Sequence, residues 1–424
     1  RRVSSVTCPQ RPMFSNTQMT QPGSETIQQP LGVAPPHFDV RLKLLFSALF
    51  IPNAIYLSFF PLWLEGRGLT AVEISTLLTL PVFVRLLITP VVAQVADNAR
   101  ERADVLTIIA AASALIICLF LIPSGYPVLL MLVMLLSAFW SPQVPIADSV
   151  ALSGVRRFGT DYASIRIWGS GLFLVVNIAA GMIIQRTSPE FAVPMMIAGF
   201  LAILAASFAT PRLGMKRQKT GGLFSSWQLL KDRRVLLILI ATGLIQASHG
   251  MMYNFGSIYW RSLGVSAQQV GFLWAIPVFA EIVMFRIYAR LLNGWSPQAV
   301  LAMAGMIAVV RWVLFAAAPD IGMGFAGFAL VQCLHGFTFG ATYLAQQTYL
   351  AHAVPEERAG AAQGIGVLVH GVIMMFVMFA SGPLYEALGG YGFLVMIFVA
   401  FAGVIAGFSF AASKKQHLPG NSSP

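Results

Sequence analysis

The chain has 424 residues, of which 57% are hydrophobic and only 10% are charged. A typical globular protein carries roughly 25% charged residues, and a soluble chain with so little charge would expose a large apolar patch. The composition therefore excludes a cytosolic enzyme, a secreted disulfide domain and a disordered protein. It predicts an all-α integral membrane protein made mostly of helices that span the lipid bilayer.

The first 40 residues differ from the rest of the chain. They are polar and rich in proline, and the chain begins with Arg1 rather than with methionine. They contain no apolar segment of the kind that a signal peptide requires. We expect residues 1–40 to be disordered or mis-annotated, with Met13 or Met19 as candidate starts.

Twelve segments are apolar and long enough, at about 20 residues each, to cross a membrane. One interruption, residues 211–233, is longer than the others and is basic. This order predicts two six-helix bundles over 41–210 and 234–412, joined by this linker and followed by a tail over 413–424. The predicted spans are 42–64, 72–96, 104–122, 127–151, 163–185, 191–210, 234–259, 268–290, 298–317, 322–351, 360–383 and 390–411.

Basic residues are distributed unevenly between the two sets of predicted loops. Loops on one side carry seventeen Lys and Arg residues, whereas the opposite loops carry three, namely Arg67, Arg186 and Arg261. Cytoplasmic loops of membrane proteins carry an excess of basic residues. We therefore expect both termini and the linker to be cytoplasmic, and we read the net charge of +11 as an orientation signal rather than as a sign of nucleic-acid binding.

The two predicted bundles contain a repeated segment. Residues 62–85 align with residues 258–281 at a constant offset of 196, with six identities that include Gly68 with Gly264 and Pro81 with Pro277. Apolar helices match by chance more easily than soluble ones, so the matched glycine and proline carry most of the weight. A parallel duplication of a six-helix unit is the simplest explanation, and such halves pack around a central substrate site.

A few ionisable residues lie inside the predicted spans. Charges in a membrane are costly, face the interior of a bundle, and mark functional sites by default. The residues of this kind are Arg85, Asp148, Arg166, Glu281 and Arg311.

Spacing along the chain predicts two ion pairs. Asp148 and Arg166 each lie nine residues from Arg157 in the loop between spans four and five, so they reach the same depth, about 13 Å along each helix. Glu281 and Arg311 are matched in the same way around the loop between spans eight and nine. Each pair either holds its helices together, or its carboxylate binds a proton, breaks the pair and couples the proton to a conformational change.

Other candidate site residues are inferred less directly. Arg85 has no predicted partner and suits an anionic ligand, whose carboxylate a guanidinium binds in two places. His335, with Gln332 and Thr338 at i, i+3 spacing, forms a polar stripe on span ten, and we expect the stripe to face the substrate cavity. The remaining candidate substrate contacts are Trp168 and Asn53.

Motifs for nucleotide, metal or disulfide chemistry do not occur in the sequence. Cys8, Cys118 and Cys333 have neither the number nor the spacing of a disulfide framework or a metal site. We therefore expect no cofactor and no bound metal, and we expect the gradient of an ion rather than ATP to supply energy.

At several segments the chain resembles the major facilitator superfamily, and within it the phenylpropionic acid permease family, which is related to the lactose and nucleoside proton symporters. IRIWGS and LHGFTFG are the more specific matches. The segments that carry the resemblance are FFPLWLEGRGLTAVEI (59–74), LPVFVRLLITPVVAQVAD (80–97), YASIRIWGSGLF (162–173), AEIVMF (280–285), RW (311–312) and VQCLHGFTFG (331–340).

The resemblance implies alternating access between two six-helix bundles, proton symport, and a family prototype that imports 3-phenylpropionate. The chain departs from the pattern in places. The loop motif after the second span is degraded to AQVADNARER, where Asp97 and Arg100 remain as candidates for a gating loop. Tyr343 stands where a histidine is expected, and no carboxylate follows His335 as it does in lactose-type carriers.

The sequence as a whole predicts a monomeric, proton-coupled symporter of the cell inner membrane for a small organic molecule such as an aromatic carboxylate. Glu281, Arg311, His335 and Asp148 are the predicted proton-coupling residues, and Arg166 joins the predicted substrate contacts. The alternatives are a symporter for a neutral sugar or nucleoside and an efflux carrier. A polytopic membrane enzyme and a non-transporting sensor are less consistent with charges deep in both halves.

Overall fold

The computed structural model describes residues 33–214, 228–355 and 358–412. Residues 1–32 of the predicted N-terminal extension, most of the linker and the tail over 413–424 lie outside the described residues. Eleven described segments are long and apolar enough to span a membrane, and the last of them, Gly360–Phe410, contains two helices. The described chain contains no β-strand. The prediction of an all-α protein with twelve spans is confirmed.

The first half of the chain forms eight α-helices. They are α1 (Phe38–Ser58), α2 (Phe60–Gly66), α3 (Ala71–Asn98), α4 (Arg102–Cys118), α5 (Tyr126–Trp140), α6 (Gln143–Phe158), α7 (Tyr162–Arg186) and α8 (Ala192–Ala209).

The second half repeats this order. Its helices are α10 (Arg233–Ala247), α11 (Gly250–Ser262), α12 (Ala267–Leu291), α13 (Pro297–Ala316), α14 (Phe325–Cys333), the π-helix η4 (Gly336–Ala341), α15 (Thr342–Ala353), α16 (Ala359–Leu388) and α17 (Phe393–Ala412).

The predicted repeat is visible in the local structure of the two halves. Gly68 and Gly264 both adopt positive φ angles, of 76° and 82°, which glycine alone reaches without strain. Two residues after each glycine a capping box begins a long helix, at Thr70 for α3 and at Ser266 for α12. The glycines and the caps are both separated by 196 residues. The repeat is therefore present in the backbone conformation as well as in the sequence.

Four of the predicted spans are broken rather than continuous. Span one divides between α1 and α2, where Pro61 lies in the first turn of α2, and span four divides at Pro142 between α5 and α6. Span seven divides at His249 between α10 and α11, and span ten contains η4. These breaks release backbone groups from the helical hydrogen-bond pattern inside the bundles.

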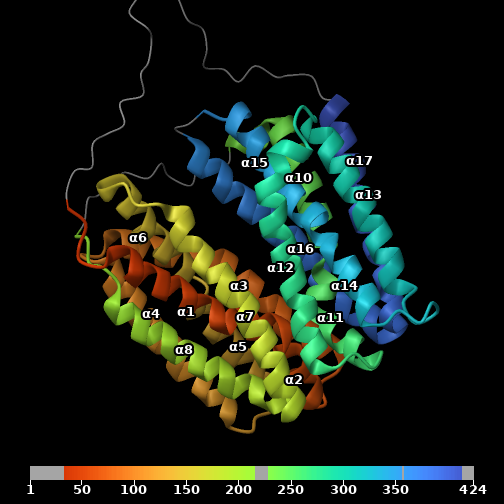
Figure 1. Ribbon diagram of the computed structural model, residues 1–424, viewed down its shortest axis with the longest axis horizontal. Coiled ribbons are helices and arrows are strands. Elements are labelled where there is room, and N and C mark those ends of the chain that lie inside the picture. Colours follow the sequence, from red (N-terminus) through yellow and green to blue (C-terminus); the bar gives the residue numbers. More distant parts are fainter. Residues whose placement is uncertain (1–32, 215–227, 356–357, 413–424) are drawn as a thin grey trace, which may run out of the picture.

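The two halves approach each other at one end of the molecule and diverge at the other (Figure 1). Between the halves, α7 packs on α12, α3 packs on α16 and α2 packs on α11. We call the end that includes Gly66, Arg186 and Ser262 the converged end. The splayed end includes Asn98 and Leu291, and the described chain begins and ends there.

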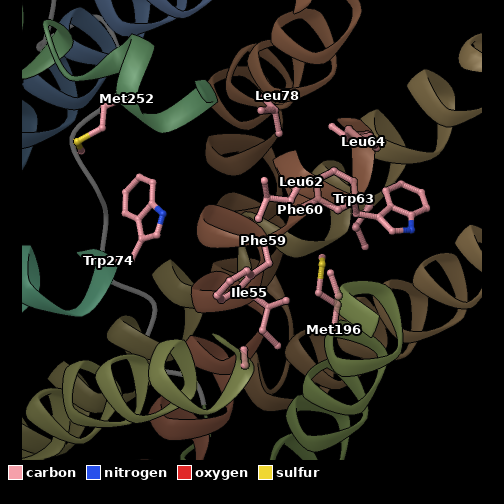
Figure 2. Close-up of a cluster of buried hydrophobic side chains, with 14 of the residues drawn as sticks. Ile55, Phe59, Phe60, Leu62, Trp63, Leu64, Leu78, Met196, Met252 and Trp274 are labelled. Carbon is pink, nitrogen blue, oxygen red and sulfur yellow. The ribbon is translucent and has the colours of Figure 1, made fainter. Parts of the chain in front are cut away.

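A buried apolar cluster crosses between the halves at the converged end. Figure 2 shows Met252 and Trp274 of the second half on one side of residues from α1 and α2, among them Phe59 and Trp63. Phe60 stacks between Tyr56 and Trp63, with ring centroids 5.0 and 5.3 Å away. This stack lies within the first half, and the burial of apolar side chains from both halves in one cluster stabilises the converged end.

Small residues let the backbones of the two halves come close. A Cβ atom added to Gly271 of α12 would lie 2.3 Å from the carbonyl oxygen of Asn177 on α7. A Cβ atom added to Gly382 of α16 would meet the Ser75 hydroxyl of α3 at 2.0 Å. Side chains at these two glycines are therefore incompatible with the observed distance between the halves.

We predict that Gly271→Ala shifts the molecule away from this arrangement, because the added methyl group meets a backbone oxygen. Overpacking of this kind costs about 1–3 kcal/mol. Spin labels on cysteines introduced at Arg186 and Gln268, both exposed at the converged end, would report a longer separation by double electron–electron resonance. Gly171→Ala is the matched control, since nothing lies within 4 Å of its added Cβ. Equal distances in both variants would contradict the prediction.

Candidate functional site

A buried guanidinium is the centre of a polar cluster in the second half. Arg311 of α13 has no exposed surface. Its Nη1 donates to His335 Nδ1 at 3.1 Å and to the Thr338 hydroxyl at 3.3 Å. Its Nη2 donates to Gln332 Oε1, and the guanidinium lies 4.9 Å from the centre of the Trp312 ring. Neutral acceptors thus pair both terminal nitrogens, whereas Arg311 Nε is buried without a partner among the described residues, and no described carboxylate contacts the guanidinium directly.

The hydrogen bonds around His335 determine its tautomer. Arginine can only donate, so His335 Nδ1 accepts and the ring proton of the neutral imidazole lies on Nε2. That nitrogen is 2.7 Å from Glu281 Oε1, to which it donates. The Glu281 side chain keeps 22% of its surface exposed, whereas that of His335 keeps 5%. Glu281 is therefore more exposed than its partner in this pair.

The predicted direct ion pair between Glu281 and Arg311 is wrong. His335 lies between the two side chains and bonds to both. Spacing along α12 and α13 brought the two charged residues to similar depth, but it contained no information on which side chain of α14 and η4 fills the space between them. The predicted grouping of Glu281, Arg311 and His335 in one cluster agrees with the structure.

His249 also belongs to this cluster and was not among the predicted site residues. It lies at the break between α10 and α11, where its Nδ1 donates to the Gln246 carbonyl at 3.0 Å. Its Nε2 is 2.9 Å from the Thr338 hydroxyl. Thr338 lies in η4, and π-helical turns inside α-helices are frequent at functional sites. A histidine within an apolar span was the signal that could have identified it.

Gln332 makes different contacts from those predicted. Its side chain is fully buried, its Oε1 accepts from Arg311, and its Nε2 donates to the Leu273 carbonyl at 2.8 Å. Both ends of its amide are therefore occupied by protein groups. In this conformation Gln332 positions Arg311 against α12 and is not available to a ligand.

The predicted ion pair of the first half is present, but its distance is the longest that counts as an ion pair. Arg166 Nε lies 4.0 Å from Asp148 Oδ1, and the same oxygen accepts from the Tyr162 hydroxyl at 2.8 Å. Both charged side chains are about one-third exposed. The guanidinium of Arg166 also lies 4.5 Å from the Phe50 ring centre. An arginine with part of its surface open and an aromatic ring beside it can contact a ligand.

The remaining predicted contacts lie on helices of the first half. Arg85 of α3 is exposed, and it makes no hydrogen bond or ion pair with any residue in the described ranges. Trp168 of α7 has 56% of its surface exposed. Asn53 of α1 donates to the carbonyl of Leu49 at 2.8 Å, which leaves its side-chain oxygen available.

The candidate residues of the gating loop lie at the turn between α3 and α4. Asp97 pairs with Arg102 at 2.8 Å, and Arg102 also donates to the Ser153 hydroxyl at 3.2 Å. Arg100 is exposed and does not contact Asp97. Arg102 is favoured because it begins α4 and is directed back across the turn, whereas Arg100 lies in the turn itself. Where the structure describes the chain, no three His, Cys, Asp or Glu residues form a group that could hold a metal ion.

Comparison with known proteins agrees with this architecture. Residues 40–395 match the MFS_1 like family. A probable 3-phenylpropionic acid transporter of Escherichia coli is 30% identical over 85% of this chain and 94% of its own length. A maltose permease of Geobacillus stearothermophilus is 26% identical over 83% of the chain and 87% of its own length.

Solved structures show the same fold. The nucleoside transporter NupG superposes with a TM-score of 0.77 at 16% identity, covering 88% of this chain and 98% of that protein. A bacterial homologue of the lysosomal transporter Spinster, in an inward-facing and occupied conformation, superposes with a TM-score of 0.72 at 11% identity, covering 89% and 98%.

We predict that Gln332→Leu destabilises the protein by about 1–3 kcal/mol, because it removes a hydrogen bond from a charged donor and leaves two buried groups unsatisfied. Thermal unfolding in detergent measures the change. Gln363→Leu is the matched control, since Gln363 is exposed and bonds only to Gln347 on the surface. A Gln332→Leu protein as stable as the control would show that the buried amide contributes nothing to Arg311.

Proposed function

The chain belongs to the MFS_1 like family of membrane transporters, and from this we propose that it is a proton-coupled symporter of a small aromatic carboxylate in the cell inner membrane. It works as a monomer and without a cofactor, because the proton gradient supplies the energy. The observation that carries the proposal is the arrangement of Glu281, whose partly exposed carboxylate bonds through His335 to the buried Arg311.

The splayed end is cytoplasmic in this proposal. The loops that are rich in lysine and arginine lie at this end, as do both ends of the described chain, and basic loops favour the cytoplasm. The conformation is then inward-facing, like that of the Spinster homologue with which the chain superposes. The converged end is the external gate, closed by the apolar cluster of Figure 2.

Glu281 is the proton carrier of the proposed cycle. Its carboxylate accepts a hydrogen bond from His335 while part of its surface remains open to solvent. Protonation of Glu281 removes the negative charge that His335 now faces. The hydrogen bond from His335 is then no longer charge-assisted, which weakens the hold of His335 on Arg311. Asp148 and Arg166 form the corresponding proton-sensitive pair in the first half.

An anionic substrate is held by the first half. Arg85 provides an exposed cation without a protein partner among the described residues, and a carboxylate fits the guanidinium in two places. Arg166 adds a second cation, and Trp168 adds an exposed aromatic face. The family relative named as a probable 3-phenylpropionic acid transporter supports an aromatic monocarboxylate as the substrate.

A neutral sugar is the second candidate, because a maltose permease is among the relatives. Asp148, Tyr162 and Asn53 offer hydrogen-bonding groups for hydroxyls. Uptake of labelled 3-phenylpropionate and maltose into proteoliposomes with an imposed proton gradient separates the two substrate classes.

We predict that Glu281→Gln abolishes uphill, proton-driven accumulation and leaves counterflow exchange, because the amide keeps the hydrogen bond from His335 but cannot carry a proton. Proteoliposomes with and without a pH gradient measure both activities. Glu386→Gln changes an exposed carboxylate of α16 and is the matched control. Normal uphill uptake by Glu281→Gln would remove Glu281 from the mechanism.

We also predict that Arg85→Gln raises the KM for 3-phenylpropionate by about tenfold or more, the effect of losing one hydrogen bond between charged groups. Inhibition by the uncharged 3-phenylpropionamide should stay unchanged, because it does not need the cation. Arg290→Gln neutralises an exposed arginine near the end of α12 and is the control. An equal loss for the acid and the amide would show that Arg85 does not bind the carboxylate.

A further inference from the structure

One buried hydrogen bond joins the two halves at the converged end. The Ser257 hydroxyl of α11 donates to the carbonyl of Ser58 at 2.5 Å, and neither residue is more than 1% exposed. The Ser58 carbonyl lies at the break between α1 and α2. The hydroxyl of the same Ser58 donates to Asn177 Oδ1 on α7. Ser58 therefore links three helices, one of which belongs to the other half.

The hydroxyl of Ser257 is oriented by a tryptophan. Trp274 Nε1 of α12 donates to Ser257 Oγ at 2.8 Å, so the oxygen of that hydroxyl is occupied and its proton is directed to Ser58. An indole N–H can only donate. The chain of donors thus runs in one direction, from Trp274 through Ser257 to the opposite half. Figure 2 shows the Trp274 indole on the side of the second half, facing the first.

The same stretch of α12 is bound to the Arg311 cluster. Gln332 donates to the carbonyl of Leu273, the residue before Trp274, and accepts from Arg311 through the other end of its amide. Trp274 also stacks on Tyr253, with ring centroids 6.3 Å apart, and Tyr253 stacks on His249 at 6.2 Å. Hydrogen bonds and stacked rings therefore run without interruption from the polar cluster to the contact between the halves.

Opening the converged end must break the bond between Ser257 and Ser58, because the two residues belong to different halves. When this end opens to water, the two groups bond to water instead, so the bond favours the closed arrangement by its net contribution, a several-fold factor in the ratio of closed to open molecules. The closed arrangement is thus favoured as long as Trp274 keeps the Ser257 hydroxyl oriented toward the Ser58 carbonyl. A change in the Gln332 bonds alters the position of α12 at the residue that carries this indole.

We propose that Ser257 and Trp274 are positioning residues that hold the converged end closed, and that Gln332 transmits the arrangement of Arg311 to them. We call Ser257 and Trp274, with the bond to Ser58, the latch, and their role in it is argued from geometry alone. The transmission from Arg311 rests on the proposed proton-coupled function, in which the bonds of Arg311 change when Glu281 binds a proton.

The latch is tested by the spin-label pair on cysteines at Arg186 and Gln268, in the full chain reconstituted in nanodiscs without substrate. Ser257→Ala removes the hydrogen bond between the halves and should raise the ratio of open to closed molecules at this end about fivefold. Ser248→Ala is the matched control, because Ser248 accepts from the indole of Trp312 at 3.0 Å within the second half alone. A ratio in Ser257→Ala equal to that in Ser248→Ala would overturn the latch.

The transmission is tested by a double-mutant cycle on the same ratio. If Gln332 acts through Ser257, then Gln332→Leu should add little to the effect of Ser257→Ala, since effects along one network are not additive. Gln332→Met replaces Gln332→Leu in the cycle if the latter does not fold, and it should likewise add little. Additive effects would overturn the transmission.

The pH dependence of the same distance separates this inference from the proposed function. The transmission is supported if the open-to-closed ratio of the wild-type protein changes with pH and if this change is smaller in the Gln332→Leu or Trp274→Phe protein. A pH response of equal size in the variants overturns it. A wild-type ratio that does not change with pH contradicts both the proposed proton coupling and the transmission. In that case the comparison of Ser257→Ala with Ser248→Ala still tests whether Ser257 holds the converged end closed.

Discussion

The guanidinium of Arg311 imposes the constraint on which the second half depends. A permanent charge without exposed surface is stable only if its donors find acceptors, and a buried arginine rarely loses its proton. One broken span provides acceptors for both terminal nitrogens, with His335 before η4, Thr338 inside it and Gln332 at the end of α14, whereas Nε has none among the described residues. The π-helix and the break at His249 are the local irregularities that bring these side chains to one point.

The two halves share a backbone but have different chemistry. α3 and α12 begin with the same glycine and the same capping box, yet Arg85 stands in one where Glu281 stands in the other. The first half presents partly exposed cations, whereas the second half buries its cation and exposes an acid. Duplication provided two equivalent scaffolds, and in the function that we propose the divergence of a few interior side chains placed the anion contact in the first half and the proton carrier Glu281 in the second.

Much of this organisation could be predicted from the sequence. The apolar segments, the repeat and the similar depth of Glu281 and Arg311 follow from hydropathy and from residue spacing, since helical geometry fixes depth in a membrane. The order of side chains within the cluster did not follow. Depth does not reveal rotation about a helix axis, so neither the bridging position of His335 nor the role of His249 could be inferred.

Contacts near the helix ends could not be predicted either. Asp97 contacts Arg102 rather than Arg100, because the turn between α3 and α4 reverses the chain within two or three residues. Helix breaks were missed because hydropathy is continuous across them. Pro61 and Pro142 indicate two of the breaks, but neither His249 nor η4 has a comparable marker in the sequence.

The breaks in spans one, four, seven and ten recur with a period of three helices. A period of three is the signature of a smaller ancestral unit, a helical triplet used four times, and inverted triplets nested within each half are known in this type of transporter. Each triplet has an irregular first helix and two regular helices behind it. Deformable elements are thus spread over four equivalent places, so rocking of the halves requires only a small bend at each of them.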